Sequence, residues 1–166
     1  MTYNVTFDKL PLTLSEMTAM PEASLEKPED TVALTVAALD ACSRDLEEGC
    51  RMLDYLRGPR PLSNAEKQFI RERFSYGGCR KVPLSYFRGA VPANDYVPEK
   101  PFTLEIRDSS SQIADEGFFK YDLVSGGADT ARPVMLRYKP SAGKYYLWEE
   151  HLLVQIRTPV SEDPWA

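Results

Sequence analysis

The first half of the chain carries its apolar residues at the spacing of helices. Between residues 31 and 42 they occupy almost every side of a helical projection, which predicts a central helix covered on several sides. Pro28, Glu29 and Asp30 come directly before this run. Proline and acidic residues are favoured at a helix N-terminus, so we expect the central helix to begin there.

Three further helices are predicted by their start and stop signals. Residues 13–16 have the spacing of a capping box and open a short helix to about Met20. Residues 63–66 have the same spacing and open a later helix that ends before Gly77 and Gly78. Between these two, Ser43 or Asp45 caps a helix that runs to about residue 56. A Gly-Pro-Arg-Pro segment over residues 58–61 stops it.

The second half changes to the two-residue period of strands. Phe102, Leu104 and Ile106 alternate with polar residues, and further strands are expected near residues 118–124, 134–138 and 144–148. The last two form a hairpin around the turn at residues 140–143. Helices followed by about four antiparallel strands predict the α+β class, with the central helix across one face of the sheet. We expect one domain over residues 1–166, mainly helical over 1–80 and mainly strand over 102–150.

Composition sets the class of protein. The chain has 166 residues, is 43% hydrophobic and 27% charged, and so matches one globular domain. A net charge of −5 argues against a nucleic-acid partner. The apolar run at 31–42 is too short to cross a membrane, and the N-terminus lacks the pattern of a secretory signal.

Cys42, Cys50 and Cys79 form no Cys-x-x-Cys pair. We therefore expect a cytoplasmic protein with reduced thiols and neither metal nor cofactor.

Charge is distributed unevenly along the chain. Residues 57–88 hold eight basic and two acidic residues, whereas the segments on both sides are acidic. This basic stretch could serve a protein-interaction adaptor that binds an acidic partner. The interpretation we prefer is that it neutralises the acidic flank of the preceding helix. That flank comprises Asp45, Glu47, Glu48 and Asp54.

The loop over residues 125–133 is the first candidate ligand site. Successive backbone N–H groups at Gly126 and Gly127 can form an anion-binding nest, to which Arg132 would add a bidentate contact. The alternative is a wide hairpin loop in which Asp129 caps its own backbone and Arg132 pairs with an acid. Trp148 is either part of the core or the apolar wall of a ligand pocket.

Catalytic groupings are weak in this sequence. The best pairing of a carboxylate with an imidazole is Glu149 with His151, which would serve a small enzyme as acid and base. Our leading hypothesis is instead a non-catalytic domain that binds a small ligand or a protein partner, as a homodimer.

Several unusual segments resemble a known family. They are residues 31–39, 58–63, 92–98, 125–133, 147–149, 156–159 and 162–166. Together they resemble a family of single-domain proteins of unknown function from clostridia and related gut Firmicutes. The resemblance covers nearly the whole chain and implies a single domain, but it transfers no catalytic residue. The order of helices and strands is also similar to cystatin-like and nuclear-transport-factor-2-like folds, which often dimerise through the sheet.

Overall fold

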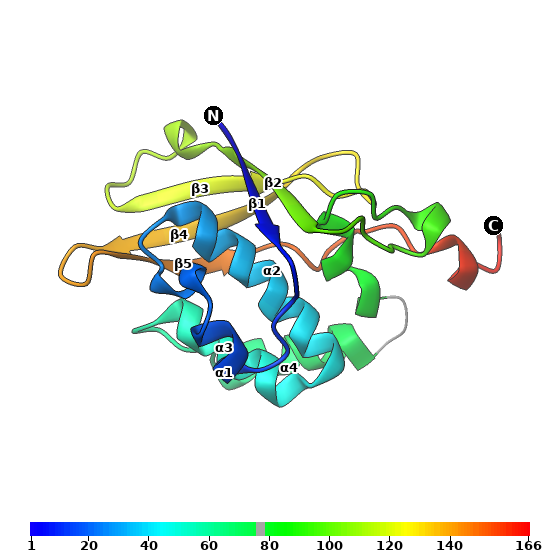
Figure 1. Ribbon diagram of the computed structural model, residues 1–166, viewed down its shortest axis with the longest axis horizontal. Coiled ribbons are helices and arrows are strands. Elements are labelled where there is room, and N and C mark those ends of the chain that lie inside the picture. The colour runs from blue at the N-terminus through cyan, green and yellow to red at the C-terminus, as the bar shows by residue number, and fades with distance from the viewer. Residues whose placement is uncertain (76–78) are drawn as a thin grey trace.

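A computed structural model describes residues 1–75 and 79–166, and it arranges the chain in two layers (Figure 1). One layer is an antiparallel sheet in which the five strands lie in sequence order, and the other contains the helices. The strands are β1 (Thr2–Phe7), β2 (Phe102–Asp108), β3 (Phe118–Leu123), β4 (Arg132–Lys139) and β5 (Lys144–Glu150). The α-helices are α1 (Leu14–Thr18), α2 (Pro28–Arg44), α3 (Leu46–Arg57) and α4 (Asn64–Ser75).

The predicted α+β class is confirmed, but the expected number of strands was wrong. The sheet has a fifth strand, β1, at the N-terminus. It pairs with β2 in the register that places Val5 opposite Leu104 and Phe7 opposite Phe102. All four α-helices lie between these two strands in the sequence, so the pairing depends on a contact that no local pattern reveals.

The central helix α2 lies across one face of the sheet, as predicted (Figure 1). Every residue from Thr31 to Cys42 is buried, because strands cover one side of the helix and α3 covers another. The start at Pro28 is also confirmed. Inside this layer, the Thr31 hydroxyl donates a hydrogen bond of 2.7 Å to the Tyr145 carbonyl oxygen and so ties α2 to β5.

Side-chain caps begin the other helices. Asp45 accepts a hydrogen bond of 3.2 Å from the Glu48 N–H at the start of α3. Ser63 and Glu66 form the full capping box of α4, with both reciprocal bonds at 3.1 Å. α4 is described as far as Ser75, and the predicted stop signal at Gly77 and Gly78 lies outside the described residues.

The outer edge of β5 is covered by groups from the helical layer. The Tyr145 N–H donates to the Leu25 carbonyl oxygen over 2.8 Å, and the Tyr145 carbonyl accepts the bond from Thr31. Farther along the strand, the Arg60 guanidinium donates to the Trp148 carbonyl oxygen. The backbone of this edge strand therefore has partners on both sides at these positions.

The segment over residues 82–101 packs on the core through its aromatic side chains. Tyr86, Phe87 and Tyr96 are buried, and Tyr86 donates through its hydroxyl to the Leu152 carbonyl oxygen over 2.6 Å. Among the described residues, no helix has the length and apolar character needed to span a membrane. The likeness to cystatin-like and nuclear-transport-factor-2-like folds stays a prediction, as does the homodimer.

Candidate functional site

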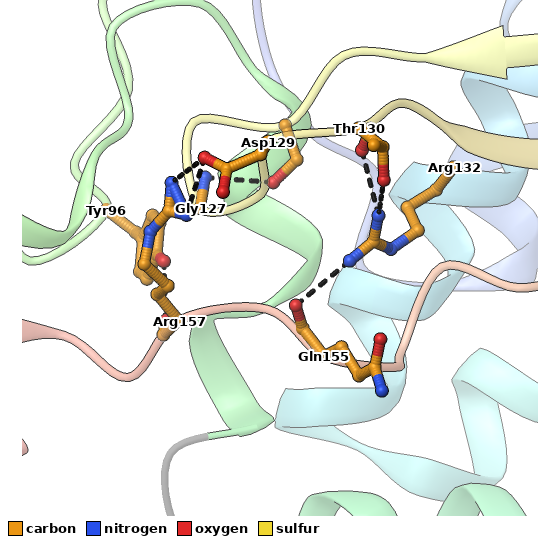
Figure 2. Close-up of polar contacts among 8 residues, drawn as sticks. Tyr96, Gly127, Asp129, Thr130, Arg132, Gln155 and Arg157 are labelled. Atoms are coloured by element: carbon orange, nitrogen blue, oxygen red, sulfur yellow. Dashed lines mark hydrogen bonds and ion pairs between the residues drawn. The ribbon is translucent and has the colours of Figure 1, made fainter.

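Arg132, the predicted anion ligand, is held by backbone carbonyl groups (Figure 2). Its guanidinium donates to the Thr130 carbonyl oxygen over 2.8 Å and to the Gln155 carbonyl oxygen over 3.0 Å. Its Nε donates to the Val154 carbonyl oxygen over 3.2 Å. These contacts join the start of β4 to the chain that follows β5.

The neighbouring glycines are also engaged by the protein. The Gly126 N–H donates to the Ser85 carbonyl oxygen over 2.8 Å, and the Gly127 N–H donates to the Ser125 hydroxyl over 3.1 Å. A Cβ atom at Gly126 would lie 1.9 Å from the Ala90 carbonyl oxygen, so glycine is required by the close approach of two backbones. Loop 125–133 packs tightly on the segment before β2.

Asp129 faces Arg157 on the C-terminal segment (Figure 2). Its carboxylate accepts two hydrogen bonds, of 2.9 and 3.1 Å, from the Arg157 guanidinium. The Tyr96 hydroxyl donates to the Arg157 carbonyl oxygen over 2.5 Å, and the Arg157 N–H donates to the Gly127 carbonyl oxygen over 2.9 Å. The structure thus brings Gly126, Gly127, Asp129 and Arg132 together and gives them protein partners. Their role in ligand binding stays a prediction.

Trp148 lies elsewhere, beside a surface groove of about 320 Å³. This Trp148 groove combines aromatic and basic side chains from the loop after α3, from β4 and from β5. Its lining residues are Arg57, Pro59, Arg60, Arg137, Tyr138, Lys139, Pro140, Tyr146, Leu147 and Trp148. Trp148 is partly exposed, and it takes no part in the buried core formed by its neighbour Leu147.

A β-bulge sets the position of the indole. Leu147 pairs with Leu136 on β4, whereas Met135 pairs with Glu149, so Trp148 is the extra residue in the ladder. Its ring meets the edge of the Phe118 ring at a centroid distance of 5.2 Å. The Arg137 guanidinium carbon lies 5.2 Å from the indole centroid. The exposed face of the sheet therefore presents an aromatic pair beside a cation.

The loop after α3 forms the other wall of the groove. At its start, Gly58 has φ of +60°, and a Cβ atom there would lie 2.5 Å from the Tyr146 ring. The buried Arg57 side chain holds the loop, because it donates to the Arg60 carbonyl oxygen over 2.9 Å and pairs with Glu66 at 2.8 Å. The sequence Gly-Pro-Arg-Pro is thus a fixed turn that presents the Arg60 side chain.

Positive charge dominates the groove. The Arg60 guanidinium carbon lies 3.8 Å from the indole centroid, on the face of the ring. Within residues 1–75 and 79–166, neither Arg60 nor Arg137 has a carboxylate within 4.0 Å. Burial and the nearby charge of Arg57 lower the pKa of Arg60, which means that its cation is less favoured here than in water. Binding of an anion would offset that cost.

Neutralisation of the acids of α3 by the basic stretch at 57–88 stays a prediction. Lys67 and Arg71 line one depression with Glu47 and Asp54 but form no ion pair with them within 4.0 Å among the described residues. In the described part of the chain, the ion pairs of this stretch join Arg57 to Glu66 and Lys81 to Asp95. Glu47 and Glu48 instead pair with Arg51 on their own helix, at 2.8 and 2.9 Å. Helical neighbours three and four residues apart form these pairs more readily than residues on another element do.

Glu149 and His151 lie at the end of β5 with their side chains exposed. The distance from Nε2 of His151 to the nearer Glu149 oxygen is 3.8 Å. The adjacent Glu150 carboxylate accepts a hydrogen bond of 2.7 Å from the Leu152 N–H, and burial raises its pKa. The described residues include no cluster of three side chains that could hold a metal ion. Use of Glu149 and His151 as acid and base stays a prediction.

Sequence reasoning selected Trp148, and it placed Arg60 in the basic stretch at 57–88, but it did not connect the two and it missed Arg137. A rigid Gly-Pro-Arg-Pro turn directly after a helix was the available signal for Arg60, because prolines on both sides restrict the backbone that carries it. For Arg137, the available signal was the predicted hairpin around residues 140–143. It places the strand of Arg137 beside the strand of Trp148, and alternation along the strand points Arg137 outward.

Comparison with known proteins gives one match. No curated protein and no solved structure matches the chain significantly. One family model covers residues 9–160, which include the four α-helices, β2 to β5, loop 125–133 and the Trp148 groove. The expected resemblance to a family of unknown function is thereby confirmed. The chain belongs to the family described as Domain of unknown function (DUF6935).

Proposed function

We propose that this protein is a non-catalytic binding domain whose Trp148 groove takes a small ligand with a planar ring and an anionic group. One observation supports this above all others. Two guanidinium groups, those of Arg60 and Arg137, lie against the indole of Trp148 and lack a carboxylate partner in the described residues. The anionic group would be a carboxylate or a phosphate, since both accept paired hydrogen bonds from arginine.

The shape of the groove supports a small occupant. Its volume of about 320 Å³ lies at the lower end of the range of ligand pockets. Pro59, Tyr138 and Tyr146 give it apolar walls against which a planar ring can pack. Because the loop at Gly58 and the β-bulge at Trp148 fix both walls, the site is formed before the ligand arrives, and binding has little ordering cost.

Tryptophan fluorescence provides a direct test. The chain has two tryptophans, so a Trp165→Phe variant leaves Trp148 as the reporter. We expect the anionic probe 8-anilinonaphthalene-1-sulfonate to quench Trp148 in a saturable manner. Replacing the two arginines that lie beside the indole, Arg60→Gln with Arg137→Gln, should weaken that binding by about tenfold or more, which corresponds to roughly 1.4 kcal/mol.

Two controls make the result specific. The neutral probe N-phenyl-1-naphthylamine lacks the sulfonate and should bind the wild type and the double variant with similar affinity. Arg88→Gln removes a basic side chain that lies on the segment before β2 and contacts Asn4, away from the groove lining. It should leave binding of the anionic probe unchanged. Equal affinity of the double variant and the wild type for the anionic probe would overturn the proposal.

Native mass spectrometry of gently purified protein addresses the natural ligand and the homodimer together. A retained mass that disappears in the Arg60→Gln and Arg137→Gln variant would support binding in the groove. A retained mass that instead disappears in Arg132→Ala would assign the ligand to loop 125–133.

For the enzyme alternative, replacement of His151 by Gln without loss of any detected activity would remove its main support.

A further inference from the structure

Residues 160–166, the Trp165 segment, hold an indole in full contact with water. Trp165 is 93% exposed, which is the largest value among the large hydrophobic side chains of the described chain. Every other residue of the segment is exposed as well. Tryptophan is the side chain that protein interfaces bury with the greatest gain, so an indole presented in this way is suited to a contact with another surface.

Hydrogen bonds give the Trp165 segment a defined shape. It begins with a 3-10 helix over Val160–Glu162. The Ser161 hydroxyl donates to the Asp95 carboxylate over 2.6 Å and so attaches the segment to the chain before β2. The Trp165 N–H donates to the Asp163 carboxylate over 2.8 Å. The segment therefore presents a planar ring and an anionic group side by side.

The Trp165 segment and the Trp148 groove have opposite charge. Residues 161–166 include Glu162 and Asp163 and no basic residue. Among the described residues, no basic side chain lies within 4.0 Å of either carboxylate. Of the ten described residues that line the groove, four are basic and none is acidic. The two surfaces are complementary in charge, and each has aromatic area to offer the other.

These two surfaces lie at opposite ends of one molecule. Figure 1 shows the Trp165 segment in red at the right, whereas the β4–β5 hairpin extends to the left. The hairpin carries the groove residues Tyr138, Lys139 and Pro140. Because the Ser161 contact holds the segment at its own end, the groove within its reach is that of a second copy.

We propose that the Trp148 groove of one molecule binds the Trp165 segment of a second copy. The Trp165 indole packs on the apolar walls of the groove, and the acidic side chains of the segment face Arg60 and Arg137. This inference rests on the proposed function, since it uses the same groove and the same pairing of a ring with an anion. Two antiparallel copies exchange such contacts in a closed dimer. A small ligand and the partner's segment then exclude each other from the groove.

Complementation between two variants tests the contact. Trp165→Ala keeps the groove and loses the indole, whereas Arg60→Gln with Arg137→Gln keeps the segment and loses the groove cations. In sedimentation velocity at up to about 1 mM protein, we expect the wild type to dimerise and each variant alone to do so at least about tenfold more weakly. An equimolar mixture of the two should form a one-to-one complex through one intact contact. A mixture that associates no more than its components would overturn the proposal.

A control and two further outcomes make this test specific. Leu12→Ala removes another exposed apolar side chain, one that lies outside both surfaces, and it should dimerise as the wild type does. If the Trp165 segments of two copies packed on each other, Trp165→Ala would lose association while the double arginine variant kept it. That result would overturn the proposal, as would a wild-type chain that stays monomeric up to about 1 mM.

The fluorescent probe separates this inference from the proposed function. Arginine-dependent binding of 8-anilinonaphthalene-1-sulfonate with failed complementation would overturn the second copy as occupant and leave the groove as a small-ligand site. Complementation without probe binding would support the contact between copies and remove the small ligand. Where both succeed, a saturating amount of the probe should dissociate the wild-type dimer. A dimer that survives saturation would overturn the placement of Trp165 in the groove.

Discussion

The guanidinium of Arg60 stacks on the indole of Trp148, with its central carbon 3.8 Å from the ring centroid, and also donates to the Trp148 carbonyl oxygen. These residues are separated by 88 positions in the sequence. A single side chain thus joins the loop after α3 to both the ring and the backbone of the edge strand β5.

Removal of this contact should lower stability by a modest amount. We expect Arg60→Ala to reduce the free energy of unfolding by about 1 kcal/mol, the magnitude of an exposed cation–π contact with an added hydrogen bond. Urea unfolding measures it. Arg88→Ala serves as the control and should change stability by less than about 0.5 kcal/mol. Equal effects of the two variants would contradict a specific role for the stack.

A side chain at Gly58 should lower the stability of the fold because it would meet the Tyr146 ring. Gly58 and Gly143 have similar positive φ angles of +60° and +65°. A Cβ atom would meet Tyr146 at 2.5 Å in the first case, and it would meet no described atom within 4 Å in the second. Gly143→Ala should therefore cost about 1 kcal/mol for the backbone alone, and Gly58→Ala should cost about 1–3 kcal/mol more. Similar melting temperatures for the two variants would show that the Tyr146 ring moves aside freely.

Arg132→Ala should act on stability through the part-buried Val154 carbonyl, which loses a charged donor, whereas water can replace the donor at the exposed Thr130 and Gln155 carbonyls. We expect a loss of about 1–2 kcal/mol in the free energy of unfolding. Arg157→Ala is the control from the same cluster. Its partner Asp129 is exposed, so the loss should stay below about 1 kcal/mol. An Arg132→Ala protein of wild-type stability that fails to retain a ligand would instead support the anion site at loop 125–133.

Asp30 should make stability depend on pH. Burial, followed by the charges of Glu29 and Glu22, raises the pKa of Asp30 from 3.8 to about 6 in the folded protein. The folded state then holds the proton more tightly than the unfolded state, so this contribution to stability is complete below pH 3.8 and is lost as the pH rises through 6. Asp30→Asn cannot ionise. Its stability relative to the wild type should therefore increase between pH 4 and pH 7, by on the order of 1 kcal/mol because the side chain is half exposed.

Urea unfolding at several pH values tests this prediction. Ser15→Ala, at an exposed position in α1, is the control: it changes no ionisable group, so its difference from the wild type should not vary with pH. A constant difference for Asp30→Asn as well would contradict the expected proton uptake on folding.

Local signals predicted the helices well, because their causes are local. Pro28 starts α2, Asp45 caps α3 and Ser63 caps α4, and each of these acts within four residues of its own position. The strand β1 was missed for the opposite reason. Its residues Tyr3, Val5 and Phe7 alternate as a strand requires, but six residues become a strand only when β2 is beside them.

The groove was only partly predictable for a similar reason. Trp148 was chosen from its place in a strand, but its exposure follows from a β-bulge that the alternation of residues does not reveal. Arg60 reaches the indole because α3 ends beside β5, which is a matter of tertiary packing.

The partners that Leu25, Thr31 and Arg60 provide along β5 also limit how two copies of this chain can join. At Tyr145 and Trp148 the bonded backbone groups of β5 offer no template to an incoming strand. A continuous sheet that runs from one molecule into the next would therefore begin more readily at β1, the opposite edge of the sheet.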